Sequence, residues 1–160
     1  MFPFSVRPLT PEDRPWVRQF WNEHWGAEWM VVHGEVFYVD DLPGFVAEQA
    51  RRLMGLATYR ISDQLCELIS LDSLVQRQGI GAVLIEAVVA AAYLAGCRRF
   101  VVTTTNDNLN ALRFYQKRGF HLACLRPGAV NASRWIKPSI PEIGEFGIPL
   151  RDEIELEKDL

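Results

Sequence analysis

The first forty residues alternate between apolar and polar positions in a way that predicts one strand and one helix. Phe4–Leu9 alternates with a period of two, as expected of a short strand. Thr10–Asp13 then combines an N-capping threonine, a proline and two acids, which is typical of a helix start. Apolar residues at helical spacing continue that helix to about Trp25. The aromatic stretch from Gly26 to Asp41 follows neither period, so we interpret it as a loop or a short helix.

Three strand-like runs come next, and a helix follows them. The runs cover residues 44–49, 52–61 and 65–71, and the polar tripeptide between the last two predicts a tight turn. The three strands are therefore expected to form an antiparallel meander. Gly79–Ala95 is apolar on most sides, which favours a helix packed against a sheet, and Gly96 stands where a left-handed C-cap is expected.

The C-terminal half adds a second strand and helix and then two more strands. Arg99–Thr105 is rich in β-branched residues, which favours a buried strand, and Asn108–Arg118 predicts a helix. Strand, helix, strand and helix in this order imply that the two strands are parallel. Strands are also expected at His121–Leu125 and Pro149–Glu157, with a loop between them. The predicted fold class is therefore mixed α/β.

Size and composition agree with one folded domain over residues 1–160. A chain of 160 residues suffices for one hydrophobic core, and 49% apolar with 23% charged residues excludes disordered and fibrous classes. The net charge of −3 argues against a nucleic-acid partner held by phosphate contacts. The charge is uneven, because residues 76–126 carry seven bases and two acids, and residues 142–160 carry seven acids and two bases. An anionic small ligand would find a favourable field in the first of these segments.

Cysteine and histidine positions give no sign of disulfides or metal ligands. Cys66, Cys97 and Cys124 are odd in number and widely spaced, and the three histidines lack the spacing of a helical metal site. The longest apolar run, Ala82–Gly96, is too short to span a bilayer, and the N-terminus has no signal-peptide pattern. The sequence thus predicts a cytoplasmic protein without a metal and without a membrane partner.

The candidate chemistry begins at residues 76–82, Gln-Arg-Gln-Gly-Ile-Gly-Ala, which follow a strand and open a helix. Glycine-rich backbone at the positive end of a helix dipole offers free N–H groups to an anion. No Lys-Ser or Lys-Thr follows Gly81, which excludes a P-loop, and Leu84 stands where a dinucleotide fingerprint needs its third glycine. The alternative is that these glycines only allow close helix packing.

A second segment, residues 108–120, restricts the kinds of protein in which the motif at residues 76–82 would occur. It reads Asn-Leu-Asn-Ala-Leu-Arg-Phe-Tyr-Gln-Lys-Arg-Gly-Phe. The two segments together resemble the GCN5-related N-acetyltransferase (GNAT) family, whose pattern is matched in order by Gln76, Gly79, Gly81, Asn108, Ala111, Tyr115, Lys117, Gly119 and Phe120. The detailed resemblance covers Leu65–Phe120, and the flanking elements agree in order only.

The resemblance implies an enzyme that uses acetyl-CoA. The pantetheine arm would lie in a cleft between the strand that ends near Leu71 and the strand that ends near Thr105. The pyrophosphate would be held by main-chain N–H groups of Arg77, Gln78, Gly79, Ile80, Gly81 and Ala82. Further cofactor-binding residues implied in the same way are Leu71, Gln76, Asn108, Ala111 and Tyr115.

The chemistry of amide formation asks for three groups. Attack of an amine on a thioester needs a base, a donor for the developing oxyanion and a proton for the departing thiolate. An unpaired backbone N–H near Leu71 is expected to serve the oxyanion, and Tyr115 is expected to donate to the thiolate. Glu67 is the expected base, and a period of two would place it on one face with Ile69 and Leu71. The alternatives are Asp72, His33, Glu48 or a chain of water molecules.

The expected reaction is transfer of an acetyl group from acetyl-CoA to a primary amine by direct attack. A covalent thiol route is disfavoured because no histidine is positioned to activate a cysteine. The acceptor, a small molecule or a peptide, is expected to contact Trp25, Trp29, His33 and Tyr38. A non-catalytic acyl-CoA-binding sensor or interaction module is the alternative function, and a homodimer is compatible with the sequence.

Overall fold

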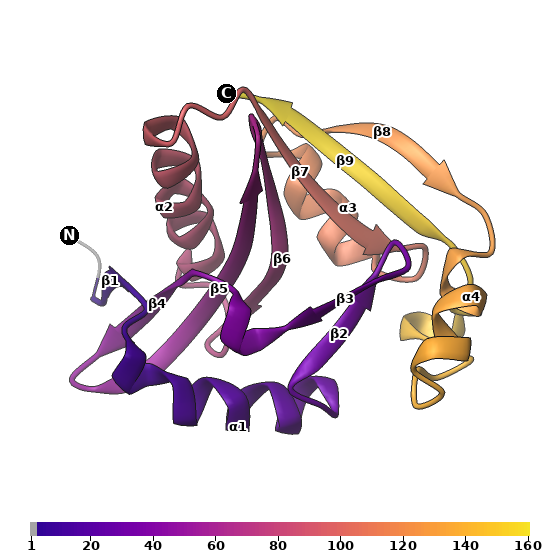
Figure 1. The fold of residues 1–160 in the computed structure, drawn as a ribbon, viewed down its shortest axis with the longest axis horizontal. Helices are drawn as coiled ribbons and strands as arrows, with labels where there is room; N and C mark the ends of the chain where they lie inside the picture. Colours follow the sequence, from indigo (N-terminus) through magenta and orange to yellow (C-terminus); the bar gives the residue numbers. More distant parts are fainter. Residues whose placement is uncertain (1–2) are drawn as a thin grey trace.

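The computed structural model of the chain describes residues 3–160 and shows a seven-stranded mixed sheet with helices on both faces (Figure 1). The strand order is β1-β4-β5-β6-β7-β9-β8. In chain order these strands are β1 (Ser5–Pro8), β4 (Gly44–Gln49), β5 (Arg52–Ser62), β6 (Leu65–Ser73), β7 (Arg99–Thr105), β8 (His121–Arg126) and β9 (Glu153–Asp159). The helices are α1 (Arg14–Trp25), α2 (Ile80–Leu94), α3 (Leu109–Gln116) and α4 (Ala129–Ile136). A separate hairpin consists of β2 (Trp29–Val32) and β3 (Glu35–Tyr38).

Most of the predicted elements are confirmed. The helix expected after Thr10 starts as a 3-10 turn at Pro11 and continues as α1 to Trp25. The meander β4–β5–β6 is antiparallel, and β6 pairs with β7 in parallel, both as expected. Gly96 ends α2 with a φ of 83°, in the left-handed region that favours glycine.

The interpretation of Gly26–Asp41 as a loop or a short helix is wrong. Residues 29–38 form the β2–β3 hairpin, and its two central turn residues, His33 and Gly34, have φ values of 43° and 80°. Positive φ at both positions is the mark of a type I′ turn, which usually carries Asn-Gly. The hairpin was not predicted because histidine replaces asparagine in the first turn position and because each strand has only four residues.

The loop expected between β8 and β9 contains helix α4, and the last strand starts later than predicted. Asn106 binds the segment that was expected to begin this strand. Its Oδ1 accepts the N–H groups of Arg151 and Asp152 at 3.0 and 2.9 Å, and its Nδ2 donates to the carbonyl of Pro149 at 2.9 Å. These backbone groups are therefore used outside the sheet, and β9 begins at Glu153.

Hydrophobic side chains form one cluster on each face of the sheet. The cluster beneath α2 and α3 includes Leu84, Val88 and Phe100, and the cluster beneath α1 and the hairpin includes Val17, Trp21 and Leu56. Neighbouring residues of a strand point to opposite faces, so Ala57 of β5 joins the first cluster and Leu56 joins the second. The sheet thus separates an α2–α3 side from an α1 side.

Strands β6 and β7 are paired over four residues and then diverge (Figure 1). Their ladder runs from Leu65 opposite Arg99 to Leu68 opposite Val102. Past that point, within residues 3–160, β6 pairs with β5 and β7 pairs with β9. Backbone groups of β6 that point toward β7 beyond Leu68 therefore face a gap between the two strands.

A β-bulge lies in β6 where this gap begins. The register with β5 shifts between Thr58 and Tyr59, which leaves Ile69 without an opposite residue. The extra residue reverses the faces of those that follow it. Ile69 packs into the α1-side cluster, whereas Leu71 packs against the α2–α3 cluster. The expectation that Glu67, Ile69 and Leu71 share one face is therefore wrong for Leu71.

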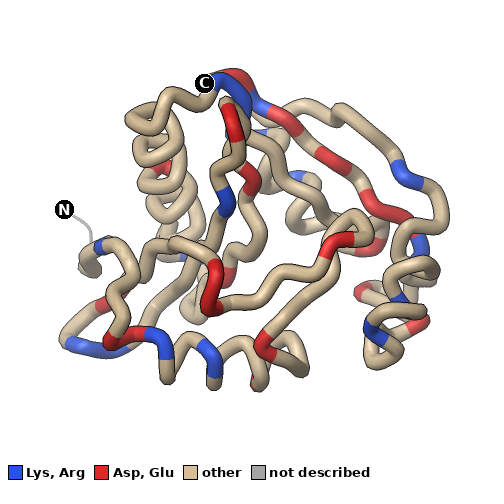
Figure 2. Tube along the Cα trace, viewed as in Figure 1, with Lys and Arg blue, Asp and Glu red and all other residues tan. Residues whose placement is uncertain are grey.

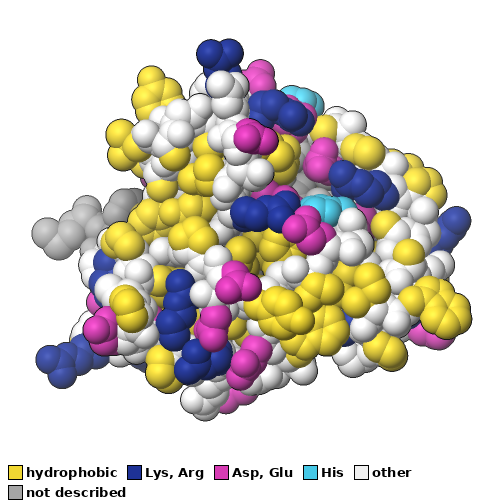
Figure 3. Space-filling model, in the orientation of Figure 1, with side chains coloured by type: hydrophobic (Ala, Val, Ile, Leu, Met, Phe, Trp, Pro, Cys, Tyr) yellow, Lys and Arg dark blue, Asp and Glu magenta, His cyan; other side chains and the backbone are white. Residues whose placement is uncertain are grey.

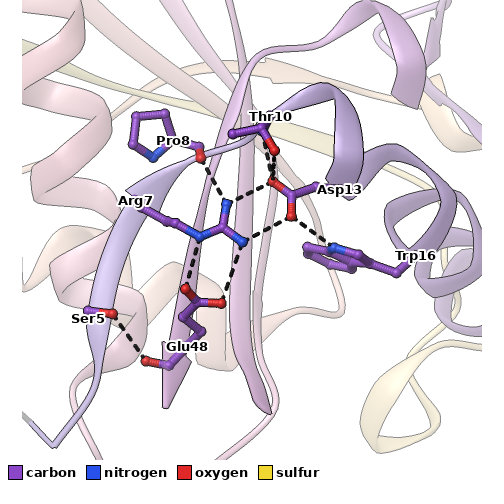
Figure 4. A network of polar contacts seen from close by, with 7 residues as sticks. All are labelled: Ser5, Arg7, Pro8, Thr10, Asp13, Trp16 and Glu48. Carbon is purple, nitrogen blue, oxygen red and sulfur yellow. Dashed lines mark hydrogen bonds and ion pairs between the residues drawn. The ribbon is translucent and has the colours of Figure 1, made fainter. Parts of the chain in front are cut away.

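A partly buried ion-pair network joins β1, the start of α1 and β4 (Figure 4). Arg7 donates to both carboxylate oxygens of Asp13 at 2.8 and 3.0 Å and to Oε1 of Glu48 at 2.9 Å. Asp13 also accepts the backbone N–H of Thr10 at 2.7 Å and the indole N–H of Trp16 at 3.1 Å. The bond from Arg7 in particular holds the pKa of Asp13 well below its usual range, although burial opposes this.

We predict that Asp13→Asn lowers the free energy of unfolding by about 2 kcal/mol at neutral pH, because charge-assisted hydrogen bonds to a buried group are lost. The folded-state pKa of Asp13 lies below its unfolded value. Its contribution is therefore complete above about pH 4 and is lost as the pH falls further, so the variant should approach the wild type in acid. Urea unfolding at neutral and acidic pH measures both effects.

The matched control is Asp40→Asn. Asp40 pairs with Arg18 at 3.0 Å, but its side chain is 49% exposed, so this change should cost less than about 0.5 kcal/mol. Equal losses in the two variants, or a loss at Asp13 that does not depend on pH, would contradict the role given to the network.

Candidate functional site

The turn before α2 presents free backbone N–H groups to solvent. Residues 76–79 are exposed, and Arg77 and Gly79 adopt positive φ values of 63° and 73°. The helix begins with the bond from the N–H of Val83 to the carbonyl of Gly79 at 3.1 Å. The N–H groups of residues 80–82 precede that bond, so they have no acceptor within the helix. The turn has the geometry of an anion-binding site at a helix N-terminus.

The two glycines of this turn have different roles. A Cβ atom at Gly79 would meet nothing within 4 Å, so this position needs glycine for its backbone conformation. A Cβ atom at Gly81 would lie 3.2 Å from the ring of Phe114 on α3 and 3.8 Å from the side chain of Leu71. Gly81 therefore allows α2 and α3 to approach closely, which is the packing role considered for the glycines of this motif.

On the other side of the gap, α3 carries the residues of the second motif. Asn108 caps the helix, because its Oδ1 accepts the N–H of Ala111 at 3.1 Å. Its Nδ2 donates to none of the described residues and is available to a ligand. Tyr115 is 6% exposed and packs edge-on against Phe114 and Phe120, with ring centroids 5.3 and 5.4 Å apart.

Tyr115 and Asp72 are coupled electrostatically across the gap. Burial raises the pKa of Tyr115, and the negative charge of Asp72 raises it further, so the hydroxyl stays protonated at neutral pH. Asp72 lies near the end of β6, and burial raises its pKa to about 6, against the opposing effects of Trp25 and His24. Its Oδ2 is buried and has no hydrogen-bond partner within residues 3–160. A buried hydroxyl and a titratable carboxyl group therefore lie close enough to interact through their charges.

Glu67 lies on the α1 side of the sheet, beneath the tip of the hairpin. It is 5% exposed, with Oε1 2.5 Å from Nε2 of His33 and Oε2 3.1 Å from Nη2 of Arg60. Glu153 of β9 is 4% exposed and accepts the backbone N–H of His33 at 3.1 and 3.2 Å. Figure 3 shows histidine, basic and acidic side chains gathered in the middle of this face.

These contacts shift the pKa values of the three groups. Burial would raise the pKa of Glu67, but the hydrogen bond and charge of His33 and the charge of Arg60 together lower it. The bond to Glu67 raises the pKa of His33, although burial opposes this. Burial raises the pKa of Glu153, with the N–H and charge of His33 and the charge of Arg126 opposing. Glu67 is therefore an anion at neutral pH, held between two donors.

The four predicted acceptor residues lie at two ends of the hairpin. Trp29 and Tyr38 face each other at the open end, and Lys137 joins Trp29 to Trp25 there by donating to their carbonyls at 3.1 and 2.9 Å. His33 forms the tip at the other end. The structure thus brings Trp25, Trp29 and Tyr38 together and places His33 at the candidate base.

Arg60, Lys137 and Glu153 were not among the site residues expected from the sequence. Glu153 starts a run that alternates acids with apolar residues, which indicates a strand with one wet face. The hairpin tip covers this face at Glu153 and buries the carboxylate. No local pattern marks Arg60 or Lys137, because their partners come from distant segments of the chain.

Some chemistries find no support in the described part of the chain. None of its helices is long and apolar enough to cross a membrane. Within residues 3–160, no group of three or more His, Cys, Asp or Glu side chains is arranged to hold a metal ion. The three cysteines are free thiols, and burial raises the pKa of Cys66 to about 12, which makes its thiolate rare at neutral pH.

Comparison with known proteins agrees with this architecture. The sequence profile of the Acetyltransferase (GNAT) family matches residues 11–120. The chain is 44% identical to the protein YdhI of Bacillus subtilis (strain 168) over 140 residues, which cover 87% of this chain and 88% of YdhI. It is 37% identical to YxbD of the same organism over 157 residues, which cover 98% and 99% of the two chains.

Solved structures share the fold. A GNAT family acetyltransferase from Elizabethkingia anophelis with acetyl-CoA bound superposes with a TM-score of 0.71 at 23% identity, covering 99% of each chain. A Bacillus subtilis acetyltransferase in complex with CoA gives a TM-score of 0.70 at 18% identity, covering 100% of this chain and 99% of that one. The chain belongs to the GNAT family of acetyltransferases.

Proposed function

We propose that the protein transfers an acetyl group from acetyl-CoA to a primary amine by direct attack of the amine. The observation that carries the proposal is the gap between β6 and β7 beyond Leu68, with the turn of residues 77–79 and the first N–H groups of α2 beside it. A gap in a sheet admits an extended arm, and a helix N-terminus next to it binds the anionic end of the same ligand. Acetyl-CoA has both parts, and it is bound to the E. anophelis enzyme of the same fold.

The residues present fit this cofactor. The N–H groups of Arg77, Gln78, Gly79, Ile80, Gly81 and Ala82 would hold the diphosphate, with Gln76 beside them. The free Nδ2 of Asn108 would donate to the pantetheine arm near Ala111. The backbone of β6 around Leu71 would supply the N–H that faces the thioester oxygen, because this stretch no longer pairs with β7.

Each catalytic need then has a candidate group in the chain. Acetyl-CoA supplies the acetyl group as a thioester. The Tyr115 hydroxyl donates a proton to the departing sulfur, and its raised pKa keeps that proton available. Glu67, on the side of the sheet that carries the hairpin, takes part in removing a proton from the amine. Trp25, Trp29 and Tyr38 offer aromatic surface to the acceptor at the open end of the hairpin.

The proposal extends to the setting in which the enzyme works. Three free thiols, two of them buried, and an acetyl-CoA substrate support a reducing, cytoplasmic compartment. A homodimer stays a prediction.

We predict that acetyl-CoA binds the wild type in isothermal titration calorimetry and that Gly81→Asp abolishes this binding. The new carboxylate would stand among the N–H groups that face the diphosphate. Because any side chain at this position also presses on Phe114, the neutral and nearly isosteric Gly81→Asn is the control. It should bind at least tenfold more tightly than Gly81→Asp. Equal affinities for the two variants, or normal binding by Gly81→Asp, would refute the diphosphate site.

We predict that Tyr115→Phe lowers turnover at least tenfold and leaves acetyl-CoA affinity within a few fold, because the hydroxyl acts mainly as the thiolate leaves. Thiol release from acetyl-CoA is measured with a panel of primary amines that includes putrescine, tyramine and amino-acid amides. Tyr59→Phe is the control, since this tyrosine is also buried but packs against Phe45 instead. Unchanged turnover in Tyr115→Phe would remove Tyr115 from the mechanism. Binding without thiol release by the wild type would favour the non-catalytic sensor.

A further inference from the structure

The tip of the β2–β3 hairpin is fixed on the sheet by two buried carboxylates. Glu67 of β6 holds the ring of His33, and Glu153 of β9 holds its backbone N–H. These strands flank β7, so the tip spans β7 close to the start of the row of acidic residues along β9 (Figure 2). The left-handed turn at His33 and Gly34 permits both contacts at once. The position of the imidazole is therefore set by the fold and does not depend on a bound ligand.

Glu67 is screened from solvent, whereas the imidazole is not. Both oxygens of Glu67 already accept hydrogen bonds, from His33 and from Arg60, and its side chain is 6% exposed. The side chain of His33 is 20% exposed. An ionised carboxylate can only accept, so Nε2 of His33 carries the hydrogen of this 2.5 Å bond. The lone pair of neutral His33 is then on Nδ1, which bonds to no other described residue.

From this geometry we propose that His33 is the catalytic base of the acetyl transfer, and that Glu67 and Glu153 are positioning residues that fix its ring and its backbone. The inference rests on the proposed function and assigns the proton-accepting atom within it. A carboxylate, an imidazole and a substrate in series give the arrangement by which a buried acid orients a histidine and stabilises its charged form. His33 thus has a chemical role beyond contact with the acceptor.

The electrostatic surroundings support this division of roles. Charged groups from four strands lie around the imidazole of His33. They are its partner Glu67 on β6, and Arg60 on β5, Arg126 on β8 and Glu153 on β9. The hydrogen bond to Glu67 in particular raises the pKa of His33 above its ordinary value, with help from the backbone of His33 itself and against burial and the charge of Arg126. Burial would raise the pKa of Glu67, but His33 and Arg60 together lower it. A base is most effective when its pKa lies near the working pH, and the imidazole meets this condition better than the carboxylate.

The protons balance with His33 in this role. Nδ1 of neutral His33 takes one proton from the ammonium form of the acceptor and passes it to solvent. The neutral nitrogen then forms the C–N bond to the acetyl carbon, and the C–S bond breaks. Tyr115 gives its proton to the sulfur and recovers one from the nitrogen as the amide forms. The net release is one proton for each acetyl group transferred to an ammonium ion.

The test is the pH dependence of kcat/KM for the best amine of the panel. His33→Asn keeps the turn, because asparagine tolerates positive φ, but it has no group that titrates near neutral pH. We expect kcat/KM to fall at least tenfold, and its increase with pH that reports deprotonation of His33 to disappear. Acetyl-CoA affinity should stay within a few fold of the wild type. We expect Glu67→Gln to move that rise to lower pH, because Glu67 raises the pKa of His33.

Two further variants separate chemistry from folding. His33→Gly removes the ring and fits the left-handed turn, and added imidazole should raise the rate of this variant at least threefold, which a structural role would not allow. Glu35→Gln is the matched control. It lies on the same hairpin, is exposed and binds Arg60 rather than His33, so its pH profile should match the wild type.

Slow hydrolysis of acetyl-CoA, in which water replaces the amine, provides a second readout that requires no acceptor. An unchanged pH profile and a rate within twofold in His33→Asn, together with no rescue by imidazole, would overturn the role of His33 while the acetyltransferase itself stands. A wild type that binds acetyl-CoA but releases no thiol to any amine or to water would overturn both proposals.

Discussion

The short pairing of β6 with β7 is the constraint on which the site depends. Each strand is held on its outer side, β6 by β5 and β7 by β9, so the two can diverge after Leu68 without losing their places in the sheet. The bulge at Ile69 bends β6 where the ladder ends. Asn106, the first residue after β7, is hydrogen-bonded to the segment before β9 and so fixes the end of β7. The gap is therefore a property of the sheet itself.

Under the proposed function, the sheet assigns the two substrates to different faces. The turn before α2, the close contact at Gly81 and the cap of α3 lie on the α2–α3 side, where an anionic cofactor fits. The hairpin and its carboxylates lie on the α1 side. The gap lies between the two faces, and the charge of Asp72 on β6 acts on Tyr115 of α3 there. An acetyl group carried into the gap from one face would thus be presented to an amine from the other.

The sequence predicts those elements of the fold whose formation depends on residues close together in the chain. The meander, the parallel strands, the helix starts and the glycine turn are marked by periodicity and by residues such as Thr10 and Gly96. The hairpin, α4 and the displaced start of β9 escape such patterns. They depend on contacts between distant residues, as when Asn106 binds Pro149 or Glu153 binds the tip of the hairpin. The face of Leu71 was missed because a bulge leaves no mark in a pattern of period two.

A crystal structure with acetyl-CoA bound would show whether the gap between β6 and β7 holds the cofactor. We expect diphosphate oxygens within hydrogen-bond distance of the main-chain N–H groups of residues 77–82, and a pantetheine arm that runs between β6 and β7 toward Tyr115. The nucleotide bound elsewhere, or this gap filled by side chains in the complex, would contradict it.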